Sequence, residues 1–241
     1  MAASRAALTR DSLRVRIVVQ KVRLAGTEYR VIRPAGPLRN GALYKAGSHY
    51  EMYVDRTDGR RIGTLWLLAA RSPRSLVYLP MRATPPVPGI GVDGERPLDL
   101  LLAPRTAPLR PSRWKRIRAC LRAANAAREL HTAGVPERDL PDLDADYVVP
   151  DDPKQADEFL LRKDVYAETL LLTGGAAAFR EGAKEIFAVT KYGPPRAATS
   201  LYIPGACNYH VCRPLYDWGL DPLHMSEWEQ LHVEFCPRWT R

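Results

Sequence analysis

Residues 49–72 read HYEMYVDRTDGRRIGTLWLLAARS, and this stretch carries the clearest local pattern in the chain. Two runs with high strand propensity flank the dipeptide Asp58-Gly59. An Asp-Gly pair is favoured in tight hairpins because glycine accepts a positive φ. The stretch therefore predicts a β-hairpin that turns at Asp58-Gly59.

Further strands are expected on both sides of this hairpin. Val15, Ile17 and Val19 alternate with other residues at the period of two that is typical of a strand. The additional strands are expected over residues 13–23, 28–33 and 75–81. Residues 1–82 are therefore predicted to form an antiparallel sheet of about four or five strands.

The pattern changes after residue 82. Seven prolines fall within residues 83–112, and proline interrupts regular structure because it lacks a backbone donor. This segment is expected to be a linker or an irregular crossover. The remainder is expected to be mainly helical, with helices over 113–134, 154–172, 176–185 and 225–235, and short strands over 186–192 and 200–204.

The predicted fold class is α+β, with an N-terminal basic antiparallel sheet followed by a mainly helical C-terminal part. Its expected parts are a β module over 1–82, a proline-rich linker over 83–112, and an α+β part over 113–241 that ends in a Cys/His-rich stretch. A chain of 241 residues can bury a core without disulfide or metal cross-links. Because no secretory signal is evident, the four cysteines indicate a reducing compartment, and we expect a cytoplasmic protein.

Membrane insertion is not expected. The longest apolar run, Leu65–Ala70, is far shorter than the roughly 20 residues that span a bilayer. With 46% apolar and 8% aromatic residues, the composition is that of a globular chain.

Positive charge is concentrated at the N-terminal end. Residues 1–82 carry a net charge of +11, whereas residues 151–241 carry −3. This asymmetry indicates a basic part that meets a polyanion or an acidic protein partner.

Nucleic acid is the polyanion that the pattern favours, because arginines interleaved with tyrosines can hold phosphates and stack bases. The leading functional hypothesis is a non-enzymatic nucleic-acid-binding protein, plausibly RNA-binding or a ribonucleoprotein subunit. The expected phosphate contacts are Arg14, Arg16, Arg30, Arg56, Arg60, Arg61, Lys115 and Arg116.

The Cys/His-rich stretch suggests a second hypothesis, a zinc site. Cys207 and Cys212 form one closely spaced pair, and His232 and Cys236 form another if residues 225–235 are helical. Convergence of the pairs would supply the four soft ligands of tetrahedral zinc. His210 and His224 are further candidate ligands.

Two other functions stay open. The same stretch could hold a cysteine nucleophile, since Cys207 or Cys212 has histidines and aspartates nearby in the sequence. The chain could also be a structural or interaction protein of a phage, plasmid or secretion system, whose basic face meets an acidic partner. Whether the protein is an enzyme is therefore left open by the sequence.

Overall fold

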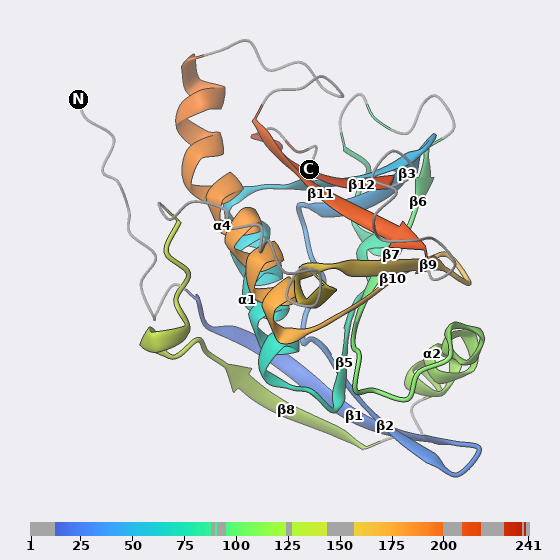
Figure 1. The fold of residues 1–241 in the computed structure, drawn as a ribbon. Coiled ribbons are helices and arrows are strands. Elements are labelled where there is room, and N and C mark those ends of the chain that lie inside the picture. Colours follow the sequence, from blue (N-terminus) through green and yellow to red (C-terminus); the bar gives the residue numbers. More distant parts are fainter. Residues whose placement is uncertain are drawn as a thin grey trace.

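A single mixed sheet dominates the protein. The computed structural model describes residues 13–87, 90, 95–123, 127–143, 157–199, 209–217, 229–237 and 239. Within these ranges, 12 strands form one sheet, and helices pack on both of its faces (Figure 1).

Helices are interspersed among the strands along the chain. The strands are β1 Val15–Leu24, β2 Thr27–Pro34, β3 Gly41–Ala46, β4 His49–Val54, β5 Ser75–Leu79, β6 Arg96–Pro97, β7 Asp99–Pro104, β8 Arg128–Ala133, β9 Leu161–Val165, β10 Thr169–Gly174, β11 His210–Asp217 and β12 Glu229–Phe235. The α-helices are α1 Arg56–Arg71, α2 Trp114–Arg122 and α4 Ala176–Thr199, and short 3-10 turns cover Met81–Ala83, Pro111–Arg113 and Glu137–Asp139. The expectation of an N-terminal sheet followed by a mainly helical part is therefore wrong.

The strand order shows why the chain does not divide into a sheet part and a helical part. The order is β6-β3-β4-β12-β11-β9-β10-β7-β5-β2-β1-β8. The C-terminal strand β12 pairs in parallel with β4, and β10 pairs in parallel with β7. Strands from the first 82 residues, from the proline-rich segment and from the C-terminal part thus share one sheet.

The predicted hairpin over residues 49–72 is wrong. Its first half is β4, but residues from Arg56 onward form α1. The carboxylate of Asp55 caps this helix by accepting a hydrogen bond of 2.7 Å from the backbone N–H of Asp58. Gly59 serves helix packing rather than a turn, because a Cβ there would overlap the side chain of Thr190 on α4.

Three further predictions of element type are corrected. The region expected as a helix over 154–172 contains β9 and most of β10, and the described part of the helix expected over 225–235 is the strand β12. The strand expected over 186–192 lies inside α4. The leucines of β10 explain one error: Leu170 and Leu172 pack on one face of the sheet and Leu171 on the other, and a strand buried on both faces shows no alternation.

Other local predictions are confirmed. β1, β2 and β5 occupy the expected places, and a helix begins at Trp114 as the sequence indicates. That helix ends at Arg122 rather than near residue 134, and β8 follows it. The proline-rich segment contains the buried strand β7 as well as irregular backbone. The strand expected over 200–204 lies outside the described residues.

The two faces of the sheet are covered unequally. Helices α1 and α4 pack together on one face over the largest apolar cluster, which we call the main core. On the other face, α2 covers a second cluster formed with β1, β2, β5, β7 and β10. The part of this second face that belongs to β4, β12 and β11 carries polar side chains, and these form the candidate site. No helix in the described part of the chain is long and apolar enough to cross a membrane.

Candidate metal centre

Strand alternation places one histidine of β12 on the second face of the sheet. Leu231 and Val233 are buried in the main core, so His232 between them points to the opposite side. The neighbouring strand β11 behaves in the same way, because Leu215 packs in the main core and strand alternation directs His210 and Cys212 away from it. His210 and Cys212 therefore lie on the same side as His232.

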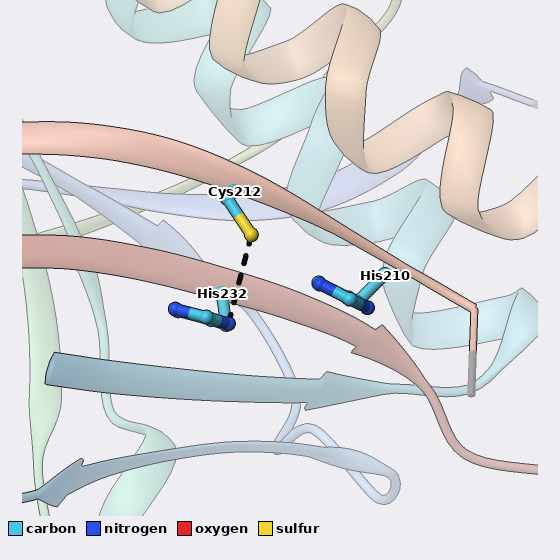
Figure 2. Close-up of side chains that lie close together, drawn as sticks. All are labelled: His210, Cys212 and His232. Atoms are coloured by element: carbon cyan, nitrogen blue, oxygen red, sulfur yellow. Dashed lines mark hydrogen bonds between the residues drawn. The ribbon is translucent and has the colours of Figure 1, made fainter. Parts of the chain in front are cut away.

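These three side chains lie close together (Figure 2). Cys212 and His232 are direct partners in the register of β11 and β12. One potential ligand atom from each of His210, Cys212 and His232 lies within 4.8 Å of the other two. The cluster thus brings one sulfur and two imidazole nitrogens together.

The spacing of the Cys212 and His232 donor atoms fits a tetrahedral zinc ion. The Sγ atom of Cys212 lies 3.6 Å from Nδ1 of His232. With bonds of about 2.3 Å to sulfur and about 2.05 Å to nitrogen, tetrahedral zinc separates these two donors by about 3.6 Å. These two ligand atoms therefore need no rearrangement to bind one ion.

A second polar group borders the cluster on β4. His49 lies with its ring centroid 4.9 Å from that of His232, and His49 Nε2 lies 3.1 Å from a carboxylate oxygen of Glu51. The hydroxyl of Tyr53 donates a hydrogen bond of 2.5 Å to the other oxygen of Glu51. Glu51 is the register partner of His232 across β4 and β12. The carboxylate thus holds His49 beside the three potential ligands.

The surroundings favour the neutral form of His232. Partial burial lowers the pKa of His232, the positive charges that His49 and His210 can carry lower it further, and Glu51 acts in the opposite direction. Metal ions bind the neutral imidazole. The environment of His232 therefore favours the form that binds a metal ion.

The donor set suits a soft or borderline divalent ion. A thiolate with two imidazoles matches zinc ligands, and His210, Cys212 and His232 would supply three of the four ligands of a tetrahedral site. Cys212 is exposed, so the cluster opens toward solvent. Three protein ligands with access for water are the pattern of catalytic zinc sites, whereas structural sites have four protein ligands.

The structure separates the metal ligands that the sequence suggested. Cys212 and His232 come together, and His210 joins them. Cys236 does not join, because in an extended chain it lies about 13 Å along from His232, and it is buried in a separate apolar cluster with Tyr44 and Tyr53. Cys207 and the further candidate His224 lie outside the described residues.

The expected phosphate-binding residues do not form one surface. Arg14 and Arg16 are exposed around the start of β1, while Arg30 points to the other face of the sheet and donates a hydrogen bond of 2.6 Å to Ser75. On α1, Arg56 is exposed, Arg60 is half-buried, and Arg61 forms an ion pair of 2.6 Å with Asp58. Lys115 and Arg116 are exposed on α2, on the opposite side of the sheet from α1. Arg30 and Arg61 are thus held in contacts within the fold.

Sequence reasoning missed His49 and Glu51. Their spacing of two residues places both on one face of a strand, and that local signal is present in the sequence. Their partnership with His232 has no such local signal, because it depends on the parallel pairing of strands about 180 residues apart.

Comparison of the chain with models of protein families, with curated proteins and with solved structures finds no match.

Proposed function

We propose that the protein binds zinc through His210, Cys212 and His232 and uses the ion in a hydrolytic reaction. The observation that carries this proposal is the convergence of the three donor atoms within 4.8 Å on an accessible face of the sheet. When bound at such a site, zinc lowers the pKa of a coordinated water to about 7 and polarises a carbonyl or phosphoryl oxygen.

His49 is the proton acceptor in this proposal. Its contact with Glu51 supports the assignment, because a carboxylate that holds one ring nitrogen fixes the tautomer and leaves the other nitrogen to accept a proton. Glu51 is itself held by Tyr53. His49 would take one proton of the attacking water, and the oxygen would then bond to the carbon or phosphorus of the substrate while the leaving group departs.

Metal analysis tests the zinc site. Wild-type protein is loaded with excess zinc, freed of unbound metal by gel filtration, and analysed by mass spectrometry. We expect about one zinc ion per chain, and near-background zinc in Cys212→Ser and His232→Ala. Cobalt loading adds a spectroscopic check, because a thiolate ligand produces a charge-transfer band that Cys212→Ser should remove.

Cys120→Ser is the matched control, because Cys120 lies on α2 and packs against a separate cluster. It should bind zinc like wild type. Cys207→Ser measures whether a fourth protein ligand contributes. Background zinc in the loaded wild type, or equal zinc in wild type, Cys212→Ser and His232→Ala, would contradict the proposal.

The contact of 3.6 Å between Cys212 and His232 also supports a second candidate, a cysteine nucleophile activated by histidine. Alkylation of Cys212 by iodoacetamide distinguishes the two candidates. A zinc site predicts that zinc slows alkylation strongly. A nucleophile predicts rapid alkylation at neutral pH that zinc leaves unchanged and that His232→Ala slows.

A further inference from the structure

One end of the sheet carries a cluster of arginines that the metal centre does not use. In β1, Val15, Ile17 and Val19 pack in the main core, whereas Val22 and Leu24 pack against α2. The even-numbered residues of β1 therefore face the α2 side. By register, the residues on this side of β8, β1 and β2 include Arg16, Val18, Gln20, Arg33, Arg128 and Leu130.

Two of these arginines flank one buried polar residue. Gln20 pairs with Arg128 of β8, and its side-chain oxygen accepts a hydrogen bond of 3.0 Å from Nε of Arg33 on β2. Gln20 is only 1% exposed, whereas Arg128 is exposed and Arg33 is half-buried. The two guanidinium groups are thus brought together on either side of β1.

Arg16 and Arg122 extend the cluster. Arg16 lies two residues from Val18 on the same face of β1, and Val18 is the register partner of Arg33. Arg122 is the last residue of α2. Its positive charge acts to lower the pKa of Tyr78, and the charge of Arg118 acts in the same direction. Tyr78 also interacts electrostatically with Arg33. Arg16 and Arg122 are both exposed. We call Arg16, Arg33, Arg122 and Arg128 the arginine patch.

No acidic residue balances the patch within the elements that form it. Among the described residues of β1, β2, β8 and α2, acidic side chains occur only at Glu28 and Glu129. Both lie at the alternate strand positions and so face the other side of the sheet, where Glu28 pairs with Arg23. Partial burial lowers the pKa of Arg33, and the charge of Arg128 lowers it further. These like charges repel one another, so a bound anion would stabilise them.

We propose that the arginine patch binds the phosphate groups of a ligand. Guanidinium groups suit this role because they bind phosphate oxygens through two parallel hydrogen bonds. Val18 and the side chain of Leu130, which is 56% exposed, add an apolar surface between the arginines. The phosphate can come from a nucleic-acid backbone or from a small phosphate compound, and the patch recognises the group that both share. This inference is independent of the metal centre, which lies on other strands of the sheet.

Binding measurements on the full chain test the proposal. The probes are a fluorescein-labelled single-stranded RNA, a labelled DNA duplex, and inorganic phosphate and ATP as competitors or calorimetric ligands. The patch variant is Arg16→Gln with Arg128→Gln, which leaves the buried Gln20 contact to Arg33 intact. The control is Lys21→Gln with Arg23→Gln, which removes the same charge from exposed positions on the opposite face of β1.

The patch variant should weaken phosphate-dependent binding by about tenfold or more, and the control should change it less than about threefold. If the ligand is nucleic acid, the slope of log K against log salt should become shallower by roughly 1.4 to 1.8 for two lost contacts. If the ligand is small, ATP or phosphate should bind while the labelled nucleic acids do not, with the same difference between variants. The proposal is overturned if no probe binds wild type at low salt, or if both variants weaken binding equally.

Discussion

The imidazole rings of His210 and His232 lie nearly parallel across β11 and β12, with centroids 5.6 Å apart and planes 12° apart. Two such rings repel each other when both are protonated, whereas neutral rings can bind one metal ion together. The arrangement also brings His210 beside Cys212, from which it is separated by one residue along β11. A divalent ion would therefore tie two adjacent strands to each other through three side chains.

Zinc should raise the stability of the protein. A ligand present at 100 times its Kd and bound only by the folded state stabilises that state by about 2.7 kcal/mol. Thermal unfolding with zinc and with a chelator should show this difference as a rise in Tm. Cys120→Ser should respond like wild type, and Cys212→Ser should not respond. An equal rise in Cys212→Ser would show that zinc acts elsewhere.

His49→Ala should slow hydrolysis strongly without releasing the metal. Loss of a general base typically lowers the rate by about 100-fold to 10,000-fold. Turnover of bis(4-nitrophenyl) phosphate and of 4-nitrophenyl acetate, measured beside the zinc content, provides the test. Glu51→Gln should lower the rate by a smaller factor, because it leaves the base in place but removes its carboxylate partner.

His131→Ala is the matched control for this test. His131 also contacts a carboxylate two residues away, with 3.3 Å between its Nε2 and Glu129, but it lies on the edge strand β8. Its removal should leave turnover unchanged. A His49→Ala variant that is as active as wild type would refute the assignment of His49.

The protein should lose stability between about pH 4.5 and pH 7 because of Glu185. Burial raises the pKa of Glu185 to about 7, and although Arg213 and Lys184 oppose this rise, Glu181 adds to it. A folded-state pKa above the unfolded value means that the folded protein holds a proton that the unfolded chain releases. This stabilisation is fully present below the pKa that Glu185 has in the unfolded chain, and it is lost as the pH rises through about 7.

Denaturant unfolding of wild type and Glu185→Gln at pH 5 and pH 8 measures this effect. The free energy of unfolding of wild type should fall relative to that of Glu185→Gln by on the order of 1–3 kcal/mol between these pH values. An equal change in the free energy of unfolding of the two proteins between pH 5 and pH 8 would contradict this prediction.

Gly182→Ala should destabilise the packing of α4 on α1. A Cβ at Gly182 would overlap the ring of Trp66, which is only 1% exposed. Overpacking of this kind typically costs about 1–3 kcal/mol, and urea unfolding would measure it. Gly36→Ala is the control, because nothing lies within 4 Å of the position that a Cβ would take there. A similar loss of unfolding free energy in Gly182→Ala and Gly36→Ala would contradict this explanation.

Asp99→Asn should be strongly destabilising. The buried carboxylate accepts hydrogen bonds from the hydroxyl of Tyr78 at 2.9 Å and from the side chains of Arg82 and Arg118 at 3.2 and 3.3 Å. Breaking a buried ion pair leaves an uncompensated charge and costs about 3–5 kcal/mol. Glu28→Gln, which removes an exposed pair with Arg23, should cost less than about 1 kcal/mol by the same unfolding assay.

Local sequence patterns predicted part of this fold well. The alternation of Val15, Ile17 and Val19 identified β1, because one side of that segment of the strand packs on the main core and the other is more exposed. The signal for the start of α2 was similarly local. In each case the signal and its structural cause lie within a few residues of each other.

Competing local signals produced the errors. The pair Asp58-Gly59 is typical of a hairpin, but Asp55 caps a helix here and the close approach of α4 requires a small residue at Gly59. In β12 the alternation of Leu231, Val233 and Phe235 was present in the sequence. Ser226 and Glu229 have the three-residue spacing of a capping box in the sequence, and this competing local signal favoured a helix over 225–235 instead.

At the candidate site, too, some features follow from the sequence and others only from the tertiary structure. Residue types are a property of the chain, so the sequence was sufficient to single out Cys212 and His232 as possible ligands and to place the excess positive charge in the first 82 residues. The partners of these residues depended on strand pairing. β12 inserts beside β4, which brings His49 and Glu51 to His232, and the extended backbone of β12 carries Cys236 away from it. Pairing between distant strands is decided by the burial of both faces of the whole sheet, and no local pattern encodes it.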